Sequence, residues 1–120
     1  MATNDTCCTI VPYFQVQSGH LEEFKALCER FVAKTEEEPD CLYYGFCFDD
    51  HVAHCREGYV NAAGLLAHLE NVGALLEEAF RISDITRLEV HGPESELDKL
   101  REPLAALNPQ YFTLEYGFRR

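Results

Sequence analysis

The sequence has little positive charge and no long apolar run, and both absences exclude classes of function. Lys and Arg number 10 against 21 Asp and Glu, which gives a formal net charge of −11. A field of that sign repels phosphate backbones and anionic membranes, so we expect no nucleic acid and no membrane among the partners. No stretch approaches the roughly 20 apolar residues of a membrane span. The opening MATNDTCC lacks the basic and apolar parts of a signal peptide, which predicts a cytoplasmic protein.

The sequence also lacks the spacings that mark disulfide, nucleotide and serine-hydrolase sites. It has six cysteines but no C-x-x-C pair, and Cys7 and Cys8 are adjacent. Cysteines of a cytoplasmic protein stay reduced, and free cysteine is commonly buried, as we expect for Cys28 on a helical apolar stripe. There is no G-x-G-x-x-G, no P-loop and no G-x-S-x-G motif. We therefore predict no disulfide scaffold and no nucleotide site.

What the sequence does contain is enough apolar material for one packed domain. Its 120 residues are too few for two ordinary domains, so we treat residues 1–120 as a single unit. Apolar residues make up 47% of the chain and include 8 Phe and 6 Tyr. A chain of this size buries roughly two-thirds of its surface on folding. A real hydrophobic core is therefore available.

Hydrophobic periodicity predicts a ferredoxin-like β-α-β-β-α-β order, followed by one more helix and one more strand. The helical stretch 61–80 is expected to kink or divide at Gly73, and Ser95 with Asp98 resembles a capping box. The predicted elements are strands 7–16, 41–48, 51–60, 84–91 and 111–118, and helices 20–36, 61–80 and 95–107. This order predicts an α+β fold with its helices on one face of an antiparallel sheet.

The strand 41–48 is apolar on both sides. One side carries Leu42, Tyr44, Phe46 and Phe48, and the other carries Cys41, Tyr43, Gly45 and Cys47. A sheet that is covered by helices on one face only should alternate apolar with polar residues. We therefore predict that a second copy of the chain covers the other face, which makes a homodimer. The strand 111–118 either completes its own sheet or joins the sheet of the partner.

Three segments carry a resemblance to a known family: VQSGHLEEFKAL, EPDCLYYGF and REGYVNAAGLLAHLENV. The most specific element joins Glu57 and Tyr59 to Ala63, His68 and Leu69. Over about residues 8–91 the chain resembles the antibiotic biosynthesis monooxygenase family, whose fold is the dimeric α+β barrel. The resemblance implies a homodimer with a small pocket between sheet and helices in each subunit.

The resemblance also implies a reaction. Some members oxidise quinols or anthrone-type polyketides with O₂ and without metal or flavin. The expected function is thus a cofactor-independent monooxygenase acting on a small phenolic, quinol or polyketide-type compound, with a small aromatic molecule as ligand. The alternative is a dimer of the same fold that only binds a small ligand or has a structural role.

The sequence departs from characterised members at several positions. Members that act on anthrones use Asn and Trp on the third strand and Tyr on the next helix, where this chain has approximately Cys55, Tyr59 and Leu65. The haem-degrading branch uses a Trp, and this chain has none. The region of its iron ligand contains Glu77, Glu78 and Ala79 here. We therefore expect no haem and no other cofactor.

His68 is the central candidate for chemistry. It falls at the margin of the apolar stripe of its helix, while Glu57 and Tyr59 project from one side of a strand because they are two residues apart. If that side faces the helix, the three side chains share a pocket wall. His68 would then be a base or donor, Glu57 would orient it, and Tyr59 with Tyr44 would stack on the substrate.

We expect Tyr44, Phe46 and Leu65 to line the substrate pocket. In the alternative reading, His68 is a boundary histidine with a satisfied hydrogen bond. Glu57 then caps a backbone group or pairs with Arg56 or Arg81 at the surface.

Two other polar clusters are weaker candidates. The run DDHVAHC at 49–55 holds possible metal ligands, but His51 and His54 point to opposite sides of a strand, so we expect no metal site. The acidic runs 36–38 and 94–98 are most simply solvated surface.

Overall fold

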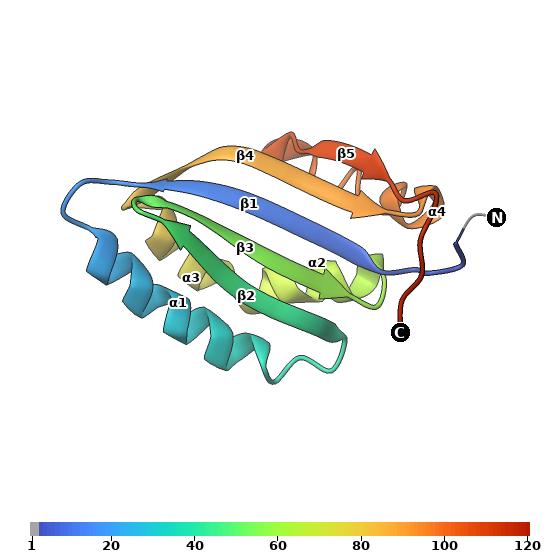
Figure 1. The fold of residues 1–120 in the computed structure, drawn as a ribbon, viewed down its shortest axis with the longest axis horizontal. Helices are drawn as coiled ribbons and strands as arrows, with labels where there is room; N and C mark the ends of the chain where they lie inside the picture. Colours follow the sequence, from blue (N-terminus) through green and yellow to red (C-terminus); the bar gives the residue numbers. More distant parts are fainter. Residues whose placement is uncertain (1–2) are drawn as a thin grey trace.

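The computed structural model describes residues 3–120 and contains one five-stranded sheet, in the order β2-β3-β1-β4-β5 (Figure 1). Neighbouring strands are antiparallel except β4 and β5, which are parallel. The elements are β1 (Cys8–Val16), α1 (Leu21–Thr35), β2 (Cys41–Asp49), β3 (Val52–Tyr59), α2 (Ala62–Asn71), α3 (Gly73–Phe80), β4 (Ser83–Gly92), α4 (Glu94–Leu97), η1 (Ala105–Leu107) and β5 (Gln110–Thr113). The predicted α+β, ferredoxin-like order is confirmed.

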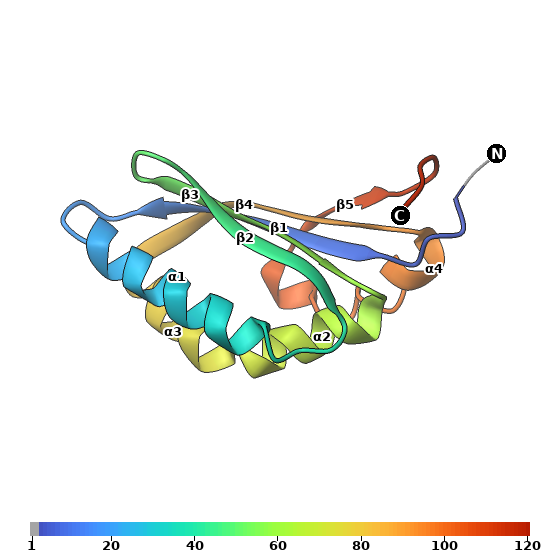
Figure 2. The same cartoon turned by 60° about the horizontal axis from the view of Figure 1, so that its bottom comes forward.

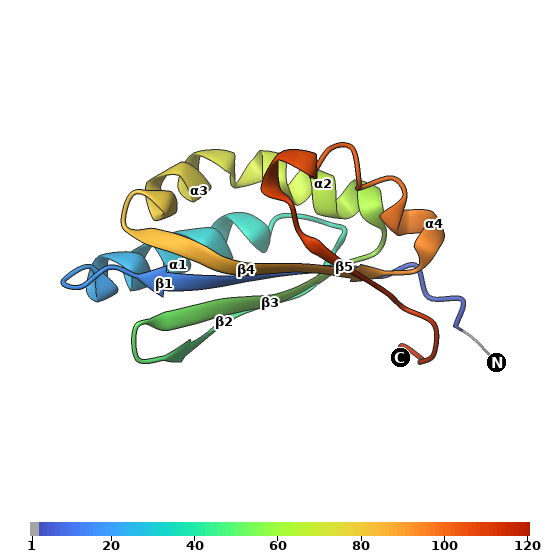
Figure 3. The same cartoon turned by 90° about the horizontal axis from the view of Figure 1, so that it is seen from above.

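The helices lie on one face of the sheet, as Figures 2 and 3 show. Helix α1 buries Phe24, Leu27, Cys28 and Phe31, which belong to the apolar stripe that the sequence predicts. The predicted division of 61–80 is confirmed, because α2 ends at Asn71 and α3 begins at Gly73. The Asn61 side chain caps α2 by accepting a hydrogen bond from the Gly64 N–H at 2.9 Å. None of the helices among residues 3–120 is both long enough and apolar enough to span a membrane.

The predicted helix 95–107 is wrong. Only the short α4 and the 3₁₀ turn η1 form there, with irregular turns between them, and α4 starts after Pro93, so Ser95 is not its cap. Pro103 explains the break, because proline has no N–H to donate and disfavours helical geometry at the residue before it. The leucines of this segment nevertheless pack in the core, since Leu97, Leu100 and Leu104 are all buried.

The predicted strand 111–118 is too long. Strand β5 pairs in parallel with β4 only as far as Thr113, and the last backbone bond runs from the Leu114 N–H to the Gly92 carbonyl at 2.7 Å. Strand β4 ends at Gly92, so the residues that follow have no neighbouring strand to pair with. Tyr116 and Phe118 are consequently exposed.

The sheet face opposite the helices carries aromatic and aliphatic side chains, and no helix of residues 3–120 covers it (Figure 2). Tyr43 of β2 and Val52 of β3 are each 41% exposed there. Tyr13 stacks on His54 with ring centroids 5.1 Å apart, and Arg56 lies over the Tyr43 ring. The two-sided apolar pattern in the sequence therefore corresponds to a partly apolar surface in the single chain.

Two hydrophobic clusters fill the space between sheet and helices. One gathers Phe14, Phe24 and Phe31 with residues of α3, and the other gathers Ile10, Leu65, Leu97 and Leu100. A pocket is lined by residues of both clusters.

Candidate functional site

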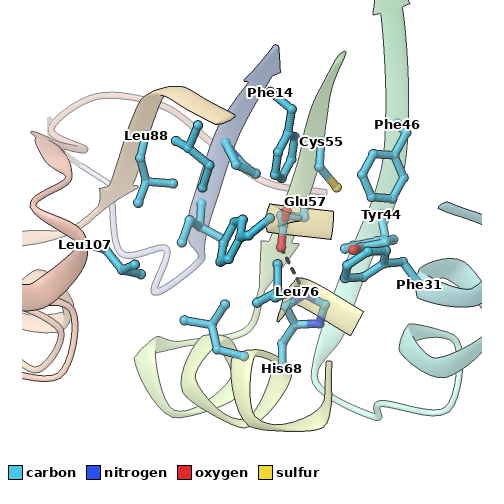
Figure 4. Close-up of a pocket in the computed structure, with 15 residues that line it drawn as sticks. Phe14, Phe31, Tyr44, Phe46, Cys55, Glu57, His68, Leu76, Leu88 and Leu107 are labelled. Carbon is cyan, nitrogen blue, oxygen red and sulfur yellow. Dashed lines mark ion pairs between the residues drawn. The ribbon is translucent and has the colours of Figure 1, made fainter. Parts of the chain in front are cut away.

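The pocket lies between the sheet and the helices, and the centre of a water-sized sphere can occupy about 90 Å³ of it. Its wall is almost entirely apolar, and Figure 4 shows Leu88 and Leu107 on the side opposite Tyr44 and Phe46. Phe80 and Leu107 line the pocket and are 42% and 45% exposed, so they border its opening. Such a cavity suits a mainly apolar small molecule.

Glu57 is the acidic group in this wall. Strand β3 turns it toward the helices, where it is only 3% exposed. Tyr59, two positions further along the same strand, donates a hydrogen bond from its hydroxyl to Glu57 Oε1 at 2.7 Å. Burial raises the pKa of Glu57 to about 7, although the hydrogen bond from Tyr59 opposes the rise. The carboxyl can thus gain or lose a proton near neutral pH.

His68 joins the wall from helix α2 and is 2% exposed. Its Nε2 lies 3.3 Å from Glu57 Oε1, the pair marked by the dashed line in Figure 4, and its Nδ1 lies 2.9 Å from Glu38 Oε2. The rings of Tyr44 and Tyr59 have centroids 5.2 Å and 5.0 Å from that of His68. Burial lowers the pKa of His68, which favours the neutral ring, while the adjacent Glu38 opposes the shift.

The sequence analysis did not predict Glu38 as a site residue. It belongs to the acidic run 36–38, which we interpreted as solvated surface, yet its side chain is only 12% exposed. Asn71 at the end of α2 donates from Nδ2 to Glu38 Oε2 at 2.8 Å and to the Lys34 carbonyl at 3.2 Å. One signal was available: Pro39 follows directly and restrains Glu38 to an extended backbone, which separates it from the exposed Glu36 and Glu37.

The structure brings most of the predicted site residues together. Glu57, His68, Tyr44 and Phe46 line the pocket, and Tyr59 contacts Glu57 and His68 from behind the wall. Leu65 is a correction, because it is fully buried in the second hydrophobic cluster and does not line the pocket. It lies three positions before His68 on α2, and packing directs it to the other cluster.

The alternative reading of Glu57 is also corrected. A carboxyl that is 3% exposed is not paired with Arg56 or Arg81 at the surface. Its partners are the buried Tyr59 and His68 instead.

Cys55 is the remaining polar residue of the wall. Burial strongly raises the pKa of its thiol, and the nearby Glu57 raises it further, so the sulfur stays protonated and is a poor nucleophile. Cys7, Cys8 and Cys28 are buried free thiols as well. Within residues 3–120 no group of three or more His, Cys, Asp or Glu side chains is placed to hold a metal ion.

Comparisons with known proteins show which solved structures this chain resembles. No protein-family model matches the sequence, and no curated protein matches it. Among solved structures, MupZ from Pseudomonas fluorescens is 54% identical, with a TM-score of 0.91 over 95% of this chain and 94% of that chain.

More distant structures share the fold. An antibiotic biosynthesis monooxygenase is 19% identical with a TM-score of 0.61, over 69% of this chain and 92% of that one. Rv0793 from Mycobacterium tuberculosis is 16% identical with a TM-score of 0.64, over 72% of this chain and 94% of that one. The resemblance noted in the sequence is thereby confirmed. The chain belongs to the same family as MupZ and has the fold of the antibiotic biosynthesis monooxygenases.

Proposed function

We propose that this protein is an enzyme that exchanges a proton with a mainly apolar small molecule, and that Glu57 is the acid–base group. The observation that carries the proposal is the Glu57 carboxyl, 3% exposed in the wall of an otherwise apolar pocket, where burial raises its pKa to about 7. A catalytic acid or base works best when its pKa lies near the working pH, and enzymes reach that value by burying a carboxyl in this way.

The direct contact with substrate falls to Glu57 and not to His68. Both ring nitrogens of His68 already face carboxylates, at 2.9 Å and 3.3 Å. Glu57 meets Tyr59 and His68 through Oε1 and has the Cys55 thiol beside it, and the carboxyl itself lines the pocket. This reverses the roles expected from the sequence, in which Glu57 orients His68.

The reaction we propose is oxygenation of a phenolic, quinol or polyketide-type compound by O₂ without metal or flavin. Glu57 removes a proton from the activated methylene of an anthrone or from the hydroxyl of a quinol, whose anion is a carbanion at a ring C–H carbon, and the carbanion passes one electron to O₂. The resulting radical and superoxide combine to a peroxide, which takes up a proton. Loss of water then leaves a carbonyl, so that one oxygen atom enters the product and the other leaves as water. The dry pocket supports the step because it leaves the anion unsolvated and reactive.

A second candidate is a proton-transfer reaction that does not use O₂. The pKa of about 7 favours it, because a half-protonated Glu57 can donate a proton to a substrate as readily as it accepts one. A third possibility is a protein that binds the molecule without changing it.

The test is turnover of a panel of hydroquinones and anthrones by the purified protein. Oxygen uptake and product mass are followed in air and again under argon. Proposed oxygenation predicts uptake that falls at least about a hundredfold in Glu57→Gln and clearly in His68→Ala and Tyr59→Phe. Glu70→Gln, an exposed change on α2, serves as the control. Product formed under argon would favour the proton-transfer reaction that does not use O₂. Binding without product in either gas would contradict the proposal that the protein is an enzyme.

We further propose that the protein acts as a homodimer, with a second copy covering the sheet face opposite the helices. Support comes from the exposed Tyr43, Val52 and Phe112 on the strands, together with the exposed Tyr116 and Phe118 beyond β5. A sheet face with apolar side chains and no helix above it is stabilised when another apolar surface covers it.

A further inference from the structure

The polar groups behind the pocket form a chain from its wall to the protein surface. Glu57 and His68 are almost fully buried, and the Glu38 side chain reaches solvent with 12% exposure. Successive groups lie 3.3 Å and 2.9 Å apart, and Asn71 holds the outer carboxylate at 2.8 Å. These residues come from β3, α2 and the turn after α1, so only the folded chain brings them together.

We infer that Glu38 is a positioning residue that fixes His68 as the Nδ1–H tautomer, and that His68 thereby serves as a proton store for Glu57. The inference rests on the proposed acid–base role of Glu57. The geometry supports it because an ionised carboxylate only accepts hydrogen bonds, so the ring nitrogen facing Glu38 must carry the hydrogen.

The fixed tautomer determines what faces Glu57. With hydrogen on Nδ1 of a neutral ring, Nε2 presents its lone pair to Glu57 Oε1 at 3.3 Å. Two lone pairs repel, so the proposal requires a proton on Glu57 Oε1 that faces Nε2. The Tyr59 hydroxyl donates its own hydrogen to Glu57 Oε1, so it does not accept the proton that faces Nε2.

The shared proton lets Glu57 act as a base even when it is protonated. As the substrate's proton arrives on Oε2, the proton on Oε1 moves to His68 Nε2. The imidazole becomes an imidazolium, and its charge is balanced by Glu38 on the other side of the ring. The movement reverses when the product takes its proton back. A carboxylate that orients a histidine and stabilises its cationic form is an established arrangement in acid–base catalysis.

The test is long-range ¹H–¹⁵N spectroscopy of the full-length, ¹⁵N-labelled protein without any ligand. The signals that disappear in His68→Gln identify His68. We expect the wild-type ring to be neutral with hydrogen on Nδ1. In Glu38→Gln the amide can donate as well as accept, so the Nε2–H tautomer should become populated. The control is Glu37→Gln, which removes the same charge from the same turn at an exposed position and should leave the tautomer unchanged.

A carboxyl-carbon titration of Glu57 is the second readout. Glu38 raises the pKa of Glu57 by charge repulsion, so Glu38→Gln should lower that pKa, and Glu37→Gln should lower it less. The other titratable groups around His68 are Tyr44 from β2 and Tyr59 from β3, which stay protonated because burial strongly raises their pKa values. Ionisation of these tyrosines therefore does not contribute to the titration of Glu57.

A wild-type ring with hydrogen on Nε2, or a tautomer that does not respond to Glu38→Gln, would overturn the inference. If Glu38→Gln does not fold, Asn71→Ala loosens the same carboxylate and should also mix the tautomers. These spectra need no substrate. The expected tautomer without turnover of any substrate would contradict the proposed function alone, whereas turnover with the wrong tautomer would contradict only the role of Glu38.

Discussion

The Tyr59 hydroxyl lies 2.7 Å from Glu57 Oε1 and donates a hydrogen bond to it inside the fold. The two residues alternate with Gly58 on β3, so the pleat places both on the side that faces the helices. A buried carboxyl with one strong donor is held in a single orientation while its pKa remains raised.

Replacing Tyr59 with Phe should raise the pKa of Glu57 above its value of about 7. The Tyr59 hydroxyl stabilises the carboxylate form, and its loss leaves the burial penalty unopposed at that oxygen. We also expect the free energy of unfolding to fall by about 1–2 kcal/mol, the cost of a buried hydrogen bond. The measurement is a carboxyl-carbon NMR titration. Tyr43→Phe, on the opposite face of the sheet, should leave the Glu57 pKa as it is, and an unchanged pKa in Tyr59→Phe would contradict the prediction.

Replacing Glu57 with Gln should change how stability depends on pH. The folded-state pKa of Glu57 is raised from 4.5 to about 7, so the folded protein holds a proton that the unfolded chain has lost between these values. The contribution of Glu57 to the free energy of unfolding is therefore fully present below about pH 4.5 and is lost as pH rises through 7. The loss is on the order of 3 kcal/mol.

Urea unfolding at pH 5 and pH 8 measures this difference. From pH 5 to pH 8, Glu57→Gln should lose less stability than the wild type, because the amide does not ionise. His68 has a lowered pKa and changes stability in the opposite direction, and it contacts Glu57. The same comparison in a His68→Gln background therefore isolates the contribution of Glu57. Parallel pH profiles of the two proteins would show that Glu57 is ionised in the fold at the lower pH.

Filling the pocket should abolish binding of an apolar molecule. Leu76 of α3 lines the pocket and is only partly buried, so Leu76→Trp can place its ring in the cavity. We expect the affinity for the neutral fluorescent probe N-phenyl-1-naphthylamine to fall at least about tenfold, which corresponds to about 1.4 kcal/mol. Ala67→Trp, at an exposed position of α2, is the control. Equal probe binding by both variants would place the binding site elsewhere.

Sedimentation velocity should find the protein at twice its chain mass of 13.7 kDa. Val52 is exposed on the sheet face opposite the helices, so Val52→Glu places a charge in the proposed interface and should shift the equilibrium toward single chains. Ala67→Glu adds the same charge on the helical side and should leave the dimer intact. A wild-type protein that sediments as one chain at micromolar concentration would contradict the homodimer.

Local signals in the sequence predicted much of this molecule. Strand alternation placed Glu57 and Tyr59 on one side of β3, and helical periodicity placed His68 near the buried side of α2. Gly73 marked the division between α2 and α3. These features depend on residues close in sequence, whose directions follow from the geometry of one element.

The errors arose where local patterns compete or where the outcome depends on another element. Leucine periodicity predicted the helix 95–107, yet the backbone constraint of Pro103 prevailed, and the leucines reached the core through turns instead. The strand 111–118 stops early because β4, its pairing partner, ends at Gly92.

The sequence by itself determined the order of strands and helices, the two-sided apolar strand and the pairing of Glu57 with Tyr59 on one face. Only the tertiary structure decided that Glu38, thirty positions from His68, faces its ring, and that Leu65 packs away from the pocket. The physical reason is that secondary-structure periodicity sets the direction of a side chain relative to its own element. The group that it meets depends on how separate elements pack together.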